Sequence, residues 1–284
     1  CMVDLQTHST ASDGLLTPTE LVEYAASVGV TALALTDHDT VAGIPEAREA
    51  GRRQDVTVIA GVELEADFDI GALHILGLGL TRLDARLESG LTVLREERTR
   101  RNLAMLSRLA ELGVEAGYDE LVSYGHGGVV GRPHLAQLLV DRGVAEHYQD
   151  AFDRFLADGG PAHEPRTAPS IAHCINLIHD AGGLAVVAHP RTLRLSSWRK
   201  LTDAFSRWKA LGLDGVEAYF AGASRDVAHH YAEIARRLGL LVTAGSDYHG
   251  RWGRPGITGV GMEIDDAFAA PFLPQAAQRE GIPR

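Results

Sequence analysis

Histidine and carboxylate residues recur in this sequence at the ends of predicted strands, where they could bind metal ions. The chain of 284 residues has 13 histidines but two cysteines, so a metal site must use nitrogen and oxygen ligands rather than sulfur. Gln6 and His8 lie two residues apart in a predicted first strand and therefore project from the same face. Asp247 and His249 repeat this spacing near the end of the chain.

Further candidate ligands follow other predicted strands or lie in the loops beside them. They are Asp13, His38, Glu63, His74 and His189. Neutral imidazoles together with carboxylates suit zinc, manganese or iron, and a carboxylate such as Glu63 can bridge two ions. Without Gln6 the set has eight members, which is too many for one tetrahedral ion. The residues therefore predict a site with more than one metal ion.

The elements that position these residues alternate between short β-rich runs and helical patterns. Thr17, Pro18 and Glu20 form a helix start with a cap, a proline at the first helical position and a capping glutamate. Predicted strands cover residues 30–35, 56–60, 73–78, 184–188, 215–218 and 240–244. Strands that alternate with helices predict an α/β fold with parallel pairing and right-handed crossovers. His38, His189 and Asp247 directly follow strands, where a β/α barrel places its catalytic side chains.

Residues 91–165 interrupt this alternation. Helical patterns cover 91–112, 132–142 and 145–157, with no strand between them. We therefore expect a barrel formed by residues 1–90 and 166–284, and an inserted helical subdomain over 91–165 that covers the active site. The charged run 95–101 mixes both signs on a predicted helix, which indicates a solvated face with local ion pairs.

Composition and charge narrow the function classes. Acidic residues outnumber basic ones by 38 to 27, and the net charge of −11 disfavours indiscriminate binding to nucleic acid or anionic membranes. No apolar run approaches the roughly 18 residues of a membrane span, and the first residues lack a signal-peptide pattern. Cys174 is the one cysteine beyond the first residue, which fits a reducing compartment. The sequence predicts a cytoplasmic protein.

Several motifs resemble the polymerase and histidinol phosphatase (PHP) family of phosphoesterases. They are DLQTHS at 4–9, SDG at 12–14, TDHDT at 36–40, GVE at 61–63, His74, AHP at 188–190 and GSDYH at 245–249. The resemblance implies a distorted barrel of seven β/α units that holds up to three metal ions. By the family pattern, His8, Glu63 and Asp247 would bind a first ion. Glu63 would bridge to a second ion at His74 and His189, whereas Asp13, His38 and His249 would bind the third.

This chain departs from the family at Gln6, where the family has histidine. A glutamine amide oxygen is a neutral, hard and weaker donor than imidazole, and it suits zinc poorly. The first ion would then bind more loosely, take water in place of that ligand, or be absent. We expect two to three divalent ions of manganese, iron or zinc. Asp37 and Asp39 flank His38, and one of them is expected to orient a ligand.

The predicted insert contains a GRPH motif at 131–134, which resembles PHP phosphatases that act on nucleoside 3′,5′-bisphosphates and short RNA 5′ ends. Arg132 could grip a phosphate through its planar guanidinium, and His134 could add a donor or an acid. Arg191, just after His189, is a second candidate clamp. The expected partner is a small phosphorylated substrate, a nucleotide, with no stable nucleic-acid complex and no membrane.

The predicted reaction is hydrolysis of a phosphomonoester by a metal-bound hydroxide, with Glu63, His38 and Asp247 as catalytic residues. A first alternative is another phosphatase of the same fold, acting on histidinol phosphate or a sugar phosphate. An amidohydrolase-type C–N hydrolase would normally need a bridging lysine, where this chain has Glu63. The third alternative, motivated by Gln6, is a degenerate PHP domain that binds or regulates without catalysis.

Overall fold

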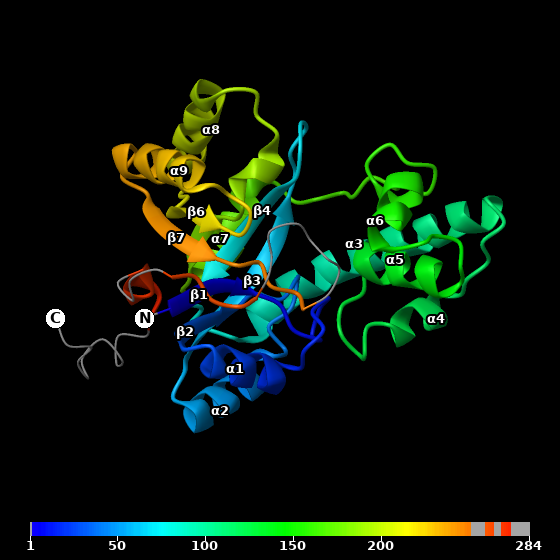
Figure 1. The fold of residues 1–284 in the computed structure, drawn as a ribbon. Coiled ribbons are helices and arrows are strands. Elements are labelled where there is room, and N and C mark those ends of the chain that lie inside the picture. Colours follow the sequence, from blue (N-terminus) through cyan, green and yellow to red (C-terminus); the bar gives the residue numbers. More distant parts are fainter. Residues whose placement is uncertain (1, 251–258, 264–267, 274–284) are drawn as a thin grey trace.

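The computed structural model describes residues 2–250, 259–263 and 268–273, and in this part of the chain seven strands form one sheet. In chain order they are β1 (Met2–Thr7), β2 (Val30–Leu35), β3 (Thr57–Ala66), β4 (Leu73–Leu78), β5 (Leu184–Val187), β6 (Gly215–Phe220) and β7 (Leu241–Gly245). The spatial order of the strands follows the chain order (Figure 1). A backbone bridge between Thr7 and Tyr248 brings the first and last strands together, so the sheet nearly closes into a barrel.

The pairing confirms the α/β class but corrects the expectation of an all-parallel barrel. Strand β4 runs antiparallel to both of its neighbours, β3 and β5, whereas the other pairs are parallel. Only residues 67–72 connect β3 to β4, without a helix. A short link can join antiparallel strands but cannot carry the chain back for a parallel crossover. The chain therefore leaves β4 at the edge opposite to that at which it leaves the other strands.

Helices cover the outside of the sheet. They are α1 (Pro18–Ser27), α2 (Ile44–Gln54), α7 (Ile171–Asp180), α8 (Trp198–Ala210) and α9 (Arg225–Arg237). The capping box predicted for Thr17 and Glu20 is present at the start of α1. A large apolar cluster fills the space between these helices and the sheet, and a second cluster, which includes Val3, Leu5 and Leu76, lies on the other face of the strands. The strands are thus packed between apolar side chains on both faces of the sheet.

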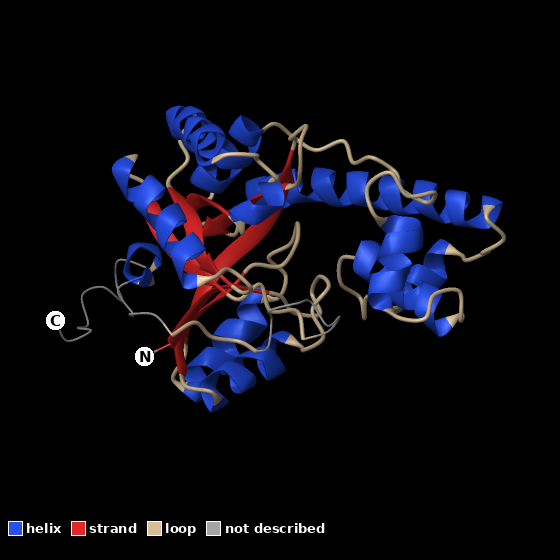
Figure 2. Cartoon of the chain, turned by 45° about the horizontal axis from the view of Figure 1, so that its top comes forward, coloured by secondary structure: helices blue, strands red, loops and turns tan. Residues whose placement is uncertain are grey.

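A helical projection stands beside the barrel and is carried by the long helix α3 (Ala85–Glu111) (Figures 1 and 2). It also contains α4 (Tyr118–Ser123), α5 (Arg132–Asp141), α6 (Tyr148–Ala151) and a π-helical turn (Phe152–Leu156). The first half of α3 packs into the barrel core through Leu87 and Leu91. Its second half packs into a separate core of the projection through Met105 and Leu109. Helix α3 therefore begins before the expected insert boundary at residue 91, and it belongs to both the barrel and the helical projection.

Among the described residues, no helix is both long enough and apolar enough to cross a bilayer.

Candidate metal centre

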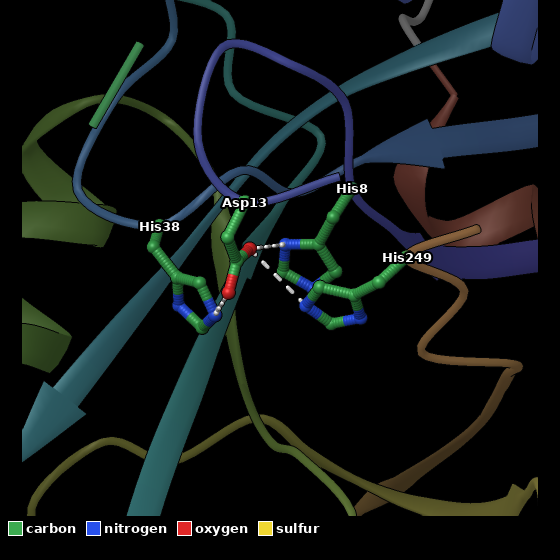
Figure 3. A group of neighbouring side chains, drawn as sticks. All are labelled: His8, Asp13, His38 and His249. Carbon is green, nitrogen blue, oxygen red and sulfur yellow. Dashed lines mark ion pairs between the residues drawn. The ribbon is translucent and has the colours of Figure 1, made fainter. Parts of the chain in front are cut away.

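The structure gathers the eight predicted nitrogen and carboxylate ligands into three overlapping groups at one edge of the barrel. These groups are His8, Asp13, His38 and His249; Glu63, His74 and His189; and His8, Glu63 and Asp247. Within each group the candidate ligand atoms lie within 4.8 Å of one another. Figure 3 shows the first group, in which the Asp13 carboxylate faces the rings of three histidines. The three groups contain the three ligand sets that the PHP resemblance implies, and His8 belongs to two of the groups.

The reversed strand β4 explains how His74 joins this cluster. His74 is the second residue of β4 and pairs with Glu65, close to the end of β3. Because β4 runs antiparallel, its start lies at the edge where the parallel strands end. His189 and Asp247 follow β5 and β7 and have positive φ angles of 25° and 56°. Non-glycine residues rarely adopt such angles, and this strain is typical of functional sites.

Glu63 lies at the middle of the cluster and is almost completely buried. Its Oε1 is 2.7 Å from Nδ1 of His74 and 3.1 Å from Nε2 of His189. Its Oε2 is 3.0 Å from Nε2 of His8 and 3.6 Å from Nδ1 of His38. Each oxygen therefore faces a different pair of imidazoles, which is the geometry required of a carboxylate that bridges two ions.

The donor atoms fit cations because several of them lack any other partner. Both ring nitrogens of His8, Oε2 of Glu63 and Nε2 of His249 are buried without a hydrogen-bond partner in the described part of the chain. A buried polar atom without a partner costs about 1–3 kcal/mol, so several in one place require an explanation. Divalent ions between these atoms would satisfy all of them at once.

The charge states within the cluster also suit metal binding. Burial lowers the pKa of His38 to about 3, so its ring is neutral at pH 7. Burial alone would raise the pKa of Asp13, but His249 and His38 outweigh it and hold that pKa well below its usual range. Burial would lower the pKa of His8, whereas the carboxylates of Asp247 and Glu63 near its Nε2 raise that pKa well above the ordinary value. Because a metal ligand must be deprotonated, a cation would compete with a proton at His8, and metal binding should be weaker at low pH.

Gln6 is fully buried beside this cluster. Its amide Nε2 donates a hydrogen bond of 3.2 Å to Oδ1 of Asp247. The same carboxylate oxygen is 3.2 Å from Nε2 of His8, so Gln6 lies next to the first of the implied ion sites. The structure thus places all nine predicted metal-site residues together.

A cavity of about 380 Å³ opens onto the cluster. Its lining includes five candidate metal-site residues and two arginines: His38, Glu63, His74, His189, Asp247, Arg132 and Arg191. Arg132 comes from α5 of the helical projection, and its Nη1 donates to Oδ1 of Asp158 at 3.2 Å. Arg191 donates to the carbonyl of Gly222 at 3.2 Å. Both predicted clamps therefore face the same space as the candidate metal ligands.

His134 has a different environment from its predicted partner Arg132. Its ring is buried at the third position of α5, where Nδ1 accepts a hydrogen bond of 3.1 Å from the backbone N–H of Gly131. His134 does not line the 380 Å³ cavity. This geometry gives the ring a structural role at the start of the helix that carries Arg132.

The charged run 95–101 makes local ion pairs as expected, such as Arg100 with Glu97, but it is not wholly a solvated face. Arg98 donates two hydrogen bonds to Oδ2 of Asp39, at 2.9 and 2.7 Å, and Arg101 is only 6% exposed. These two arginines line a second cavity of about 130 Å³, together with His38, Asn102 and Arg132. The spacing of residues 95, 98 and 101 places three arginines on one helix face, but this spacing alone does not show that the face is covered.

Arg101 lacks a charged partner at this cavity. Its Nε donates to the backbone carbonyl of Glu164, and no carboxylate pairs with it among the described residues. Burial, together with the neighbouring charge of Arg132, lowers the pKa of Arg101 to about 10. Positive charge therefore accumulates beside the candidate ligands without full neutralisation, which favours the binding of an anion.

Two buried carboxylates support the cluster, one from the TDHDT motif (Asp37) and one outside every quoted motif (Glu217). Asp37 accepts hydrogen bonds from the backbone N–H and the hydroxyl of Ser9 and from the hydroxyl of Ser12, at 2.8, 2.7 and 2.6 Å. These bonds fix the loop between His8 and Asp13. Glu217 on β6 accepts from the backbone N–H of His189 at 2.9 Å, and burial raises its pKa well above the usual range.

Comparisons with known proteins agree with the fold and the site. The family model of the PHP domain matches residues 4–158. A 5′-3′ exoribonuclease of Haemophilus influenzae is 36% identical over 87% of this chain and 89% of its own. A 3′,5′-nucleoside bisphosphate phosphatase of Chromobacterium violaceum is 34% identical over 87% of each chain. A solved structure from Bifidobacterium adolescentis, whose predicted activity is that of a metal-dependent phosphoesterase, matches with a TM-score of 0.83 and 33% identity over 95% of each chain.

A nearly closed α/β barrel with a histidine and carboxylate cluster at one edge defines the class of metal-dependent phosphoesterases. Within this class, the chain belongs to the PHP family.

Proposed function

We propose that this phosphoesterase hydrolyses the 3′-phosphoryl group of a nucleotide that also carries a 5′-phosphate. Nucleoside 3′,5′-bisphosphates and the 5′ ends of short RNAs both have this arrangement. In both, cleavage of the same O3′–P bond releases a nucleoside 5′-monophosphate. The proposal thereby accounts for a bisphosphate phosphatase and a 5′-3′ exoribonuclease among the relatives.

The observation that carries this proposal is the group of arginines beside the candidate metal centre. Arg101 and Arg132 line the same small cavity as Asp13 and His38. A substrate with two phosphates could place one at the metal ligands and the other at these arginines. The charge that Arg101 leaves without a partner would then be neutralised by the substrate.

The proposed cofactor is two or three divalent ions of manganese, iron or zinc, held by the three groups of ligands. When bound, such ions lower the pKa of water and neutralise negative charge on a phosphoryl group. Glu63 would be shared by two ligand groups, because each of its oxygens faces a different pair of imidazoles. Asp247 would supply a further ligand to one of these groups, and His38 would be a ligand in the remaining group. Arg132 and Arg191 would orient the phosphate in the 380 Å³ cavity. The helical insert (residues 91–165) would thus complete the substrate pocket of the barrel.

A substrate panel tests the proposal. Purified protein with Mn²⁺ should release phosphate from adenosine 3′,5′-bisphosphate with a kcat/KM about 10–150 times higher than from adenosine 3′-monophosphate. A charge-assisted hydrogen bond contributes about 1.5–3 kcal/mol, which corresponds to this range. Arg101→Met should remove most of the difference, whereas Arg100→Met should keep it because Arg100 is half exposed and paired with Glu97. Equal rates on both substrates would contradict the role of the second phosphate.

The same panel separates the alternatives. A preference for histidinol phosphate or a sugar phosphate would identify another phosphatase of this fold. A protein that is inert with every substrate after reconstitution with each ion would support a degenerate binding module. An amidohydrolase-type bridge is disfavoured because both lysines of the chain, Lys200 and Lys209, belong to α8 on the outside of the barrel, and Glu63 occupies the centre.

A further inference from the structure

Gln6 and Glu217 are buried neighbours beside the candidate metal centre, and each has an oxygen without a partner. Both side chains are 0% exposed. Oε1 of Gln6 and Oε2 of Glu217 have no hydrogen-bond partner in the described part of the chain. Two such oxygens in a closed interior carry a substantial cost unless another state of the protein supplies donors to them. The raised pKa of Glu217 has the same cause, because its ionised carboxylate is buried with one hydrogen-bond donor, the backbone N–H of His189.

The backbone at Gly245 brings these two side chains together. A β-carbon at this position would lie 2.4 Å from Oε2 of Glu217 and 2.6 Å from Cβ of Gln6, so a larger residue would collide with both. Each side chain is also tied to a candidate ligand at its other polar atom. Glu217 Oε1 accepts from the backbone of His189, and Gln6 Nε2 donates to Asp247. The pair therefore connects His189 in one ligand group with Asp247 in another.

The amide of Gln6 has two orientations of nearly equal shape, which exchange its oxygen and its nitrogen. In the observed orientation, Nε2 faces the Asp247 carboxylate, which is favourable when no cation is bound there. A divalent ion beside Asp247 would repel this N–H group and attract the amide oxygen. The turned amide would present Oε1 to the ion and place Nε2 where Oε1 now lies, away from Asp247.

We propose that Gln6 is an amide-oxygen ligand of the ion at His8, Glu63 and Asp247, and that Glu217 is the positioning residue that fixes the amide by accepting from Nε2. This arrangement resembles the carboxylate that commonly orients a metal-binding histidine through its second nitrogen. Because an amide oxygen is a hard donor, this site should favour Mn²⁺ over Zn²⁺ more than a histidine would. The inference depends on the proposed metal centre but not on the proposed substrate.

Metal binding without substrate tests this inference. Chelator-treated protein is titrated with Mn²⁺ while free Mn²⁺ is followed by electron paramagnetic resonance, and then with Zn²⁺ in competition. Gln6→Leu and Glu217→Gln should each weaken the most loosely held Mn²⁺ about 10–100-fold. In Glu217→Gln, the new oxygen must accept from His189, so the new NH2 group would face Nε2 of Gln6 and oppose the turned amide. Gln6→His should shift the same site toward Zn²⁺.

Matched variants control for surface and folding effects. Gln54→His adds a histidine at the end of α2, and Glu233→Gln removes an exposed carboxylate on α9; both should bind metal like the wild type. An unchanged Mn²⁺ affinity in Glu217→Gln would overturn the positioning role, and an unchanged affinity in Gln6→Leu would overturn the ligand role. If Glu217→Gln does not fold, Gln6→His decides, because an unaltered ratio of Mn²⁺ to Zn²⁺ affinity would refute the hard-donor site.

Discussion

Arg166 connects the helical projection to the barrel through buried charges, and its removal should destabilise the protein strongly. Its guanidinium is 2% exposed and lies 3.0 Å from Oδ2 of Asp39 and 2.7 Å from Oε2 of Glu65. Asp39 also pairs with Arg98 of α3, at 2.7 Å. The cluster therefore joins the loop after β2, the strand β3, helix α3 and the segment that returns from the projection.

The expected loss of unfolding free energy in Arg166→Met depends on the partners that Asp39 and Glu65 still have. Removing one partner of a buried ion pair typically costs about 3–5 kcal/mol, because the other charge stays buried. Asp39 would keep its two hydrogen bonds to Arg98, and Glu65 is 23% exposed and can be partly hydrated. Both facts place the expected loss of unfolding free energy at the lower end, about 3 kcal/mol.

Urea unfolding followed by circular dichroism measures this loss directly. Arg100→Met is the matched control, because Arg100 is 48% exposed and makes its ion pairs with Glu97 and Glu164 at the surface. Exposed pairs contribute about 0–1 kcal/mol, so this variant should unfold at nearly the wild-type urea concentration. A loss below 1 kcal/mol for Arg166→Met would show that the cluster is well hydrated in solution, and the argument from burial would fail.

Three further predictions concern acid, packing and metal. Burial would raise the pKa of Asp39, but Arg98 and Arg166 outweigh burial and lower that pKa below the unfolded value of about 3.9. The ionised Asp39 carboxylate therefore stabilises the folded protein above pH 4, and this stabilisation is lost as the pH falls further. Thermal unfolding measured from pH 7 to pH 3 should show the loss. Gly128→Ala should destabilise the protein by about 1–3 kcal/mol in the same urea assay, because the new β-carbon would lie 2.1 Å from the backbone oxygen of Thr10, whereas Gly117→Ala meets no atom within 4 Å and should unfold like the wild type. Chelation should lower the midpoint of thermal unfolding, and added Mn²⁺ should restore it. The stabilisation by Mn²⁺ should be about 2.7 kcal/mol when the free metal concentration is 100 times its Kd. An unchanged midpoint would argue against bound ions.

The ligand cluster could be predicted from the sequence because most of its members occupy repeated local contexts. His38, His189 and Asp247 each follow a short apolar run, and the ends of parallel strands meet at one edge of a barrel. The rule did not apply to His74, which lies at the start of a strand. It reaches the same edge because the link between β3 and β4 is too short for a crossover, and strand direction is not encoded in hydrophobic patterning alone.

Other features depend on contacts between distant segments and left little trace in local pattern. The run that contains Arg98 and Arg101 is typical of an exposed helix face. In the structure Arg101 donates to the backbone of Glu164, and Arg98 and Arg166 share Asp39, so segments distant in the sequence cover this face. Glu217 is a single carboxylate within an apolar strand, and only the three-dimensional structure shows that it supports His189. Local periodicity identifies which face of an element is apolar, but not which polar residue a distant loop will cover.

The length of α3 has a consequence for substrate size. Near its start, Arg86 pairs with Asp180 at the edge of the barrel opposite the metal ligands; near its middle, Arg98 reaches Asp39 beside them; and its last turns carry the core of the projection. If the helical projection anchors one end of the substrate as proposed, each turn of α3, which advances about 5.4 Å, would change how far that end lies from the bond that is cut. Relatives with one turn more or less in this helix should accept molecules of a different reach without any change in their metal ligands.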